Sequence, residues 1–170
     1  KLVEEFIEEN EVTPVIHLAT DINYLDICEY LQRAFQNIGI EIIIDLMPTA
    51  TLRQAKSAGN IESFRASWIA DYPDAENYLS LFYSKNFSPV GPNYTHFEND
   101  NFDKKYLKTM KISDTEKRVS YYKIMDEILM TEFPVIPLYY DQAVRFSRKN
   151  IRGLEMNSIN LLNLKRVSKD

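Results

Sequence analysis

The most regular hydrophobic pattern lies in the first third of the chain. Apolar side chains recur at spacings of three and four over residues 24–38, which predicts an amphipathic helix that ends at Gly39. Short apolar runs of strand type precede and follow this helix, at residues 14–19 and 40–47. A strand, a helix and a second strand in this order predict two parallel strands that are joined by a right-handed crossover.

A further apolar run, at residues 63–70, ends at a carboxylate and a turn signal. Its Phe, Trp and Ile residues favour a strand, and the Tyr72–Pro73 step then keeps residue 72 out of helical backbone and stops the ladder. Asp71 is therefore expected at the carboxyl end of a strand, on the same edge as the loop after Ala19. Ligands of open α/β sheets bind outside this edge. Asp71, with Trp68 and Tyr72 nearby, is thus a candidate receptor for a ligand cation.

The rest of the chain predicts further helices and two extended segments. Helical spacing marks residues 1–9, 51–58, 75–84 and 102–110, and a capping box at residues 113–116 begins another helix. Residues 134–146 read as an extended segment, in which Tyr139 and Tyr140 point to opposite faces. One of these tyrosines should be in the core and the other should line the site, and the pattern leaves open which. The tail is expected to form a last strand with Ile159, Leu161, Leu162 and Leu164.

The segment around Asp71 also carries a resemblance to a known family. Its sequence Arg65-Ala66-Ser67-Trp68-Ile69-Ala70-Asp71-Tyr72, followed by Asp74, Asn77, Leu79 and Phe82, resembles the oligopeptide- and dipeptide-binding proteins of ABC importers, known as solute-binding protein family 5. The likeness continues to the end of the chain, in the order in which the family has these features. The later matches are Phe97–Asp103, Ile136–Tyr140 and Ile151–Leu154.

This resemblance implies a fold and a cellular setting. The expected fold is α/β: one lobe of a clamshell of the periplasmic-binding-protein type II kind, with an open, mostly parallel sheet flanked by helices. Family members are longer and have two lobes, so residues 1–170 are expected to be a single domain, a C-terminal lobe that lacks the N-terminal lobe of the same chain. The implied partners are a peptide ligand and the permease subunits of the importer. The implied location is extracytoplasmic, either periplasmic or as a cell-surface lipoprotein.

The resemblance also gives roles to individual residues. Asp71 would neutralise the α-ammonium of an extended peptide, whose backbone would pair with the lobe as an added strand. Arg65 lies six residues earlier, at a position that can lie near the carboxylate of the peptide. Trp68, Tyr72 and Tyr139 would complete the ligand-binding set, with Trp68 either a pocket wall or a packing residue.

Composition narrows the remaining choices. A chain of 170 residues that is 45% hydrophobic is long enough for one core, and its net charge of −5 disfavours nucleic acid as a partner. Cys28, the only cysteine, fits a buried position on the stripe of residues 24–38. His17 and His96 have no ligand partner at metal spacing, and no phosphate-binding or nucleophile-elbow motif occurs, so neither a metal nor a cofactor is expected.

Three other functions stay open. The same fold could bind a nickel chelate, haem or a sugar in place of a peptide, or it could be a structural domain without a ligand. The third is a hydrolase that uses Asp71 and Asp74 as a carboxylate pair. These two residues flank a turn and diverge, whereas the carboxylates of a glycosidase must face one bond across about 5 to 9 Å. A binding protein is therefore favoured over an enzyme.

Overall fold

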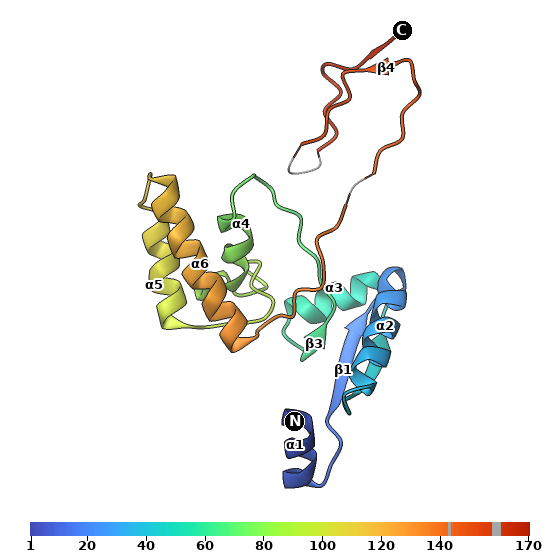
Figure 1. Cartoon of the computed structure of the whole chain (residues 1–170), viewed down its shortest axis with the longest axis vertical. Helices are drawn as coiled ribbons and strands as arrows, with labels where there is room; N and C mark the ends of the chain where they lie inside the picture. The colour runs from blue at the N-terminus through green and yellow to red at the C-terminus, as the bar shows by residue number, and fades with distance from the viewer. Residues whose placement is uncertain (143, 158–160) are drawn as a thin grey trace. The chain divides into compact units, whose positions relative to one another are not determined.

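The predicted strand, helix and strand are present, and the two strands are neighbours in a three-stranded sheet, with the first of them at its centre (Figure 1). The computed structural model describes residues 1–142, 144–157 and 161–170. In it β1 (Val15–Thr20) is followed by the 3₁₀ helix η1 (Ile22–Tyr24), α2 (Leu25–Gln36) and β2 (Glu41–Leu46). The strands β1 and β2 are parallel, as predicted, and they pair in register from Val15 opposite Glu41 to Thr20 opposite Leu46.

The chain divides into two compact units. The first unit comprises Lys1–Ser67 and Ser84–Phe97, and the second comprises Trp68–Tyr83 and Glu98–Asp170. The expectation that residues 1–170 are one domain stays a prediction.

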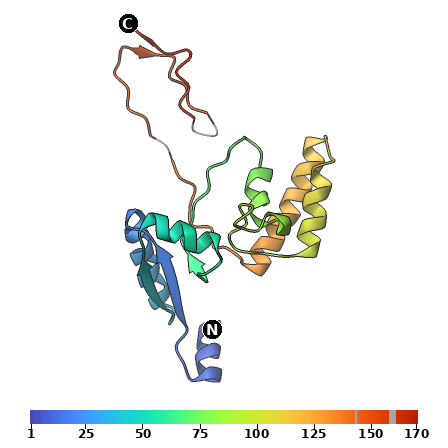
Figure 2. The same ribbon diagram turned by 180° about the vertical axis from the view of Figure 1, so that it is seen from behind.

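The first unit packs helices against the sheet. Besides the elements above, it contains α1 (Leu2–Asn10), α3 (Thr49–Ser57) and η3 (Ser84–Asn86). Both ribbon views show α2 lying along β1 and β2 (Figure 2). The buried apolar residues of this unit are Ala19, Cys28, Ile42 and Leu52, which confirms the expected burial of the cysteine. Gly39 has a φ of +84° and ends the α2 segment as predicted.

The third strand is much shorter than the predicted strand at residues 63–70. It is β3 (Ser63–Phe64), which pairs in parallel with Leu18 and Ala19 of β1. One more hydrogen bond follows, from Arg65 N to Ala19 O at 3.0 Å. The ladder then stops because β1 itself ends at Thr20, so residues 66–70 have no neighbouring strand with which to pair. Asp71 therefore does not follow a strand directly, and the prediction of a strand-end position for it was wrong.

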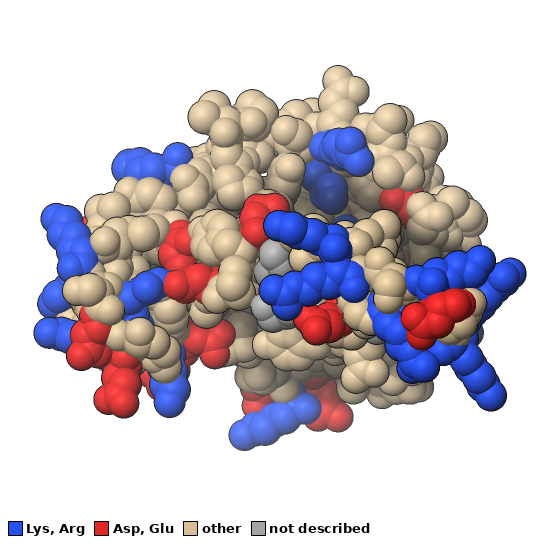
Figure 3. Space-filling view, turned by 90° about the horizontal axis from the view of Figure 1, so that it is seen from above, with Lys and Arg blue, Asp and Glu red and all other residues tan. Residues whose placement is uncertain are grey.

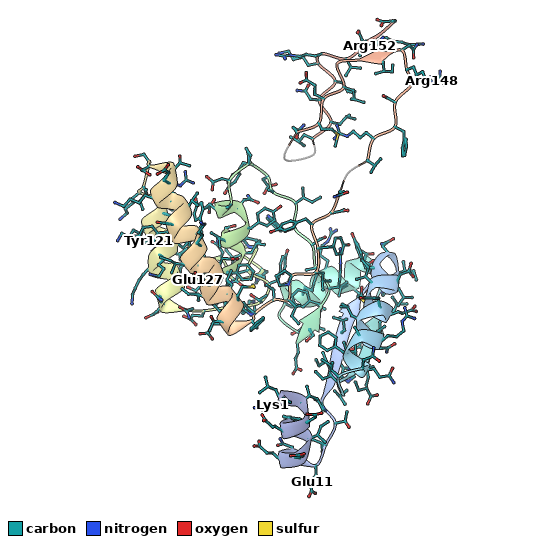
Figure 4. The ribbon with its side chains drawn as sticks, viewed as in Figure 1. Lys1, Glu11, Tyr121, Glu127, Arg148 and Arg152 are labelled. Atoms are coloured by element: carbon teal, nitrogen blue, oxygen red, sulfur yellow. The ribbon has the colours of Figure 1, made fainter. Side chains whose placement is uncertain are left out.

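The second unit is built mainly from helices. It contains α4 (Glu76–Leu79), η2 (Ser80–Phe82), α5 (Asp100–Thr109) and α6 (Thr115–Glu132). Figures 1 and 2 show α5 and α6 side by side, and Lys108 Nζ on α5 lies 5.1 Å from the ring centroid of Tyr121 on α6 (Figure 4). The buried apolar residues are Leu79, Phe102, Tyr106, Met125 and Leu129.

Three sequence predictions for the second unit need correction. The helix expected over residues 75–84 divides into α4 and η2. The predicted capping box does not form. The N-cap is Asp114, whose Oδ1 accepts a hydrogen bond from Lys117 N at 2.8 Å. A box would need Glu or Gln at position 117, three residues after this cap, and Glu116 lies one position too early. The tail forms no strand at residues 161–164, and Ile159 lies outside the described residues. The pair that does form is antiparallel, between β4 (Ile151–Arg152) and β5 (Ser168–Lys169).

The surface carries both signs of charge. Figure 3 shows acidic and basic side chains over the same face of the molecule. Near the end of the chain, Arg152 Nε donates to Asp170 Oδ2 at 3.1 Å (Figure 4). Within the described ranges, no helix combines the length and the hydropathy that crossing a membrane requires.

Candidate functional site

A pocket of about 140 Å³ opens in the first unit, at the carboxyl ends of β1 and β3. The segment after β1 contributes one wall, α3 contributes another, and the chain after β3 contributes the third. The lining residues are Thr20, Asp21, Tyr24, Thr49, Leu52, Arg53, Lys56, Arg65, Ala66 and Ser67. This is the sheet edge where the sequence predicted a ligand, because parallel strands bring their carboxyl ends to one side.

Arg65 is the predicted site residue that lines this pocket, and two neighbours hold it. Its guanidinium carbon lies 3.2 Å from the ring centroid of Tyr24, and its Nη1 donates to Ser67 Oγ at 3.3 Å. Stacking on an aromatic ring leaves the edge of a guanidinium free to donate to an anion. Tyr24 therefore fixes the plane of the Arg65 head group.

Lys56 adds a second cation to the pocket wall. Its Nζ lies 5.5 Å from the Phe64 ring centroid and 5.7 Å from that of Tyr94. Burial is the main cause that lowers the pKa of Lys56, and the nearby charges of Arg65 and Arg53 lower it further, against a smaller opposing effect of Asp21. An anion that entered the pocket would offset this mutual repulsion.

Asp21 is the acidic residue among these lining side chains, and the fold already uses it. Its Oδ1 accepts hydrogen bonds from Asn23 N and from Asn23 Nδ2, both at 2.9 Å, and it caps η1. Only 6% of the residue is exposed. The pocket lining therefore contains three cationic side chains, Arg53, Lys56 and Arg65. It contains one carboxylate, Asp21, which is already hydrogen-bonded.

Four of the predicted site residues, Trp68, Asp71, Tyr72 and Tyr139, belong to the second unit, and one asparagine there joins two of them. Trp68 Nε1 donates to Asn77 Oδ1 at 2.7 Å, and the backbone N–H of Asp71 donates to the same oxygen at 3.3 Å. Trp68 is partly buried, whereas Asp71 is exposed. These contacts fix the loop backbone and leave the Asp71 carboxylate facing solvent.

Tyr72 takes part in a small cluster around a buried carboxylate. Its hydroxyl and that of Tyr106 both donate to Glu76, which is 8% exposed. The hydrogen bond to Glu76 and then burial raise the pKa of Tyr72, while the nearby amide of Asn77 acts in the opposite direction. Burial and then the Glu76 bond raise the pKa of Tyr106 well above its ordinary value. Both phenols are therefore donors at neutral pH.

The carboxylate of Asp74 makes several contacts within the second unit. Its Oδ1 accepts from Tyr122 OH at 2.9 Å and from Glu76 N at 3.0 Å, and its Oδ2 pairs with Arg118. Partial burial opposes ionisation of Asp74, but these three hydrogen bonds and the Arg118 charge outweigh it and lower the pKa of the carboxyl. A carboxylate so tightly held is a poor general acid or nucleophile.

The remaining candidate residues, Tyr139, Tyr140, His17 and His96, do not line the pocket. Tyr139 is 56% exposed and Tyr140 is 95% exposed, so neither is a core residue, which corrects the expectation that one of them is buried. His17 pairs with Asp45 across β1 and β2 at 3.1 Å, and His96 contacts Ser88. The described part of the chain holds no group of His, Cys, Asp and Glu side chains that could bind a metal.

Sequence reasoning missed Tyr24, Arg53 and Lys56 as pocket residues. Tyr24 was assigned to the apolar stripe of the helix, and the two cations looked like ordinary polar positions of a short helix. A signal was present, since Arg53 and Lys56 are three residues apart and so share a face of α3. The sequence pattern could not show that this face of α3 lies at the carboxyl end of β1.

Comparison with known proteins supports the resemblance. The family model for bacterial extracellular solute-binding proteins, family 5 Middle, matches residues 2–89, which is just over half of the chain. A probable deoxycholate-binding periplasmic protein, YgiS of Escherichia coli, is 26% identical over 71% of this chain and 22% of its own length. The dipeptide-binding protein DppE of Bacillus subtilis is 24% identical over 96% of this chain and 30% of its own length.

A solved structure agrees at the level of the fold. The periplasmic binding protein DppA of Helicobacter pylori, in complex with the peptide STSA, superimposes with a TM-score of 0.68 at 21% identity, over 77% of this chain and 27% of that one. The type II clamshell fold that the resemblance implied is thereby confirmed for this α/β chain. The chain spans between about a fifth and a third of the length of these relatives.

Proposed function

We propose that this chain, which belongs to family 5 of the bacterial extracellular solute-binding proteins, is part of a longer, two-lobed protein that binds peptides for an ABC importer. The missing partners would then be an N-terminal lobe of the same chain and the permease subunits. The protein would act outside the cytoplasm, in the periplasm or as a cell-surface lipoprotein. Relatives named as binding proteins rather than enzymes support a binding role.

The cationic pocket of the first unit is the observation that carries this proposal. A free peptide has a carboxylate at one end, and a planar guanidinium held against Tyr24 suits such a group. Lys56 and Arg53 add positive charge from α3. We assign the carboxylate of the ligand, either the peptide terminus or an acidic side chain, to Arg65 and Lys56.

The second contact in the proposal is made by Asp71. Its side chain is exposed while its backbone N–H is held by Asn77, so the backbone that carries the carboxylate is positioned and the negative charge is not neutralised by that contact. An ammonium that pairs with it inside a closed cleft gains more than it would in water, because the effective dielectric constant falls. Trp68, Tyr72 and Tyr139 would supply apolar contacts to the ligand.

A bile acid is the second candidate ligand. The similarity to a probable deoxycholate-binding protein favours it, and a steroid carboxylate would also suit Arg65 and Lys56. The two ligand classes differ at the other end, since a bile acid has no ammonium. A peptide therefore needs both the cationic pocket and Asp71, whereas a bile acid needs the pocket alone.

Calorimetric titration of the full-length protein that carries this chain tests the choice. The ligands are a mixed set of di- to pentapeptides, the same peptides with an acetylated amino end or an amidated carboxyl end, and deoxycholate. Peptide binding predicts saturation by the free peptides and weaker binding of both blocked forms. Saturation by deoxycholate without any response to peptides would overturn the peptide proposal and support the bile acid.

A further inference from the structure

Asn77 joins two of the proposed ligand contacts, Trp68 and Asp71, although it is itself buried. Its exposed fraction is 4%, so its side chain cannot offer much surface to a ligand. Its Oδ1 accepts from the indole of Trp68 at 2.7 Å and from the backbone N–H of Asp71 at 3.3 Å.

The position of Asn77 is in turn fixed by the helix to which it belongs. Its backbone N–H donates to Asp74 O at 3.1 Å, and its carbonyl accepts from Ser80 Oγ at 2.8 Å. The preceding residue, Glu76, is tied to Tyr106 of α5. The amide of Asn77 thus links a loop without regular structure to a helix that is anchored in the core of the second unit.

We propose that Asn77 is a positioning residue that holds the ring of Trp68 and the carboxylate of Asp71 in one arrangement for the amino end of the ligand. This inference rests on the proposed function, in which Asp71 binds the ligand ammonium. An asparagine suits the task because one amide oxygen can accept two hydrogen bonds. Without that acceptor, the Asp71 backbone and the indole would each lose a partner, and the carboxylate would sample several positions.

The experiment measures peptide dissociation constants for variants of the full-length protein. Asn77→Leu keeps a similar volume but removes the acceptor, and we expect it to weaken binding of free peptides by about tenfold or more, which corresponds to roughly 1.4 kcal/mol. Binding of the N-acetylated peptides should change by less than about threefold.

Two controls separate positioning from packing. Ser80→Ala removes a hydrogen bond to the backbone carbonyl of Asn77 and leaves its side chain untouched, so it should bind free peptides like the wild type. In the Asp71→Asn background, Asn77→Leu should have little further effect, because the two residues act on the same ammonium. If Asn77→Leu does not fold, Asn77→Ser takes its place, since its shorter side chain cannot reach both donors.

The outcomes distinguish this inference from the proposed function. If Asp71→Asn weakens binding and the Asn77 variants do not, the positioning role is overturned and the Asp71 contact stands. If Asn77→Leu weakens free and acetylated peptides equally, and adds fully to Asp71→Asn, Asn77 is a packing residue and the inference fails. If Asp71→Asn has no effect, the ammonium contact lies at another residue and the inference about Asn77 fails with it, whereas the peptide proposal rests on the cationic pocket and is decided by the titration of free and blocked peptides.

Discussion

The guanidinium carbon of Arg65 lies 3.2 Å from the centre of the Tyr24 ring, although the two residues are 41 positions apart in the sequence. The contact arises because β3 pairs with β1, which brings the chain after Phe64 beside the chain after Thr20. The ring covers one face of the guanidinium and restricts the direction in which its N–H groups point. Arg65 is therefore oriented before any ligand arrives, which lowers the entropy that binding must remove.

Tyr24→Leu should weaken ligands that carry a free carboxylate. Leucine keeps an apolar contact but has no ring face, so we expect the dissociation constant for free peptides to rise about three- to tenfold in the full-length protein. Binding of peptides with an amidated carboxyl end should change much less. Tyr30→Leu, at a 66% exposed position of α2, is the matched control. An equal loss for free and amidated peptides would show that Tyr24 acts through packing instead.

Asp71→Asn should lose far more affinity than stability. Removing one member of a charge pair that closure has desolvated costs about 2 to 5 kcal/mol, or roughly 30-fold to several thousandfold in dissociation constant. Asn keeps the shape and one acceptor, and the native side chain is exposed, so the midpoint of thermal unfolding should barely move. Acetylated peptides should bind the wild type weakly and respond least to the substitution.

The control for this prediction is Asp126→Asn, which removes a carboxylate from an exposed position on α6. It should bind like the wild type, so that a general effect of net charge is excluded. Binding of free peptide by Asp71→Asn within about threefold of the wild type would place the ammonium contact at another residue.

The sequence predicts the β1–α2–β2 unit well, because each of its signals is local. The apolar stripe, the Ile-rich run and Gly39 all act within one element or at its end. The length of β3 could not be predicted in this way, since it depends on where the neighbouring strand ends. Residues 66–70 have a strand-like composition, but β1 stops at Thr20 and leaves them without a partner.

The candidate site shows the same division between local and tertiary information. Arg65, Trp68, Asp71 and Tyr72 can be proposed from the sequence because they lie in one continuous segment with a family likeness. Tyr24 and Lys56 come from other elements and join Arg65 only through the order of the strands. The role of Asn77 depends on an indole nine residues earlier, which no helical or strand period relates to it.

Glu76→Gln should destabilise the second unit. Hydrogen bonds to a buried charged acceptor contribute more than neutral ones, so the free energy of unfolding should fall by about 1 to 3 kcal/mol. Tyr106→Phe removes one of the two donors and should cause a smaller loss. Glu127→Gln, at an exposed position of α6 (Figure 4), serves as the control. Urea denaturation measures all of these, and a Glu76→Gln variant as stable as the control would show that the carboxylate charge is unimportant.

The pair of Asp74 and Arg118 should make stability depend on pH in a defined direction. The folded protein holds the pKa of Asp74 below its ordinary value of 3.8, so the ionised form is favoured by folding. The resulting stabilisation is fully present above that ordinary value and is lost as the pH falls through the lowered pKa. Arg118→Met removes one of the causes of the shift, and should therefore destabilise the protein more at neutral pH than in acid.

Denaturant unfolding of the wild type and Arg118→Met, measured from about pH 7 to pH 3, tests this linkage. The difference in unfolding free energy should be constant down to about pH 5 and should shrink below about pH 4, as Asp74 takes up a proton in both states. Lys104→Met is the matched control, because Lys104 pairs with Asp100 at an exposed position, 3.6 Å away, where ion pairs contribute little. A difference that stays the same at every pH would mean that Arg118 stabilises the fold through the packing of its side chain and its contact with Tyr122, and not through the charge of Asp74.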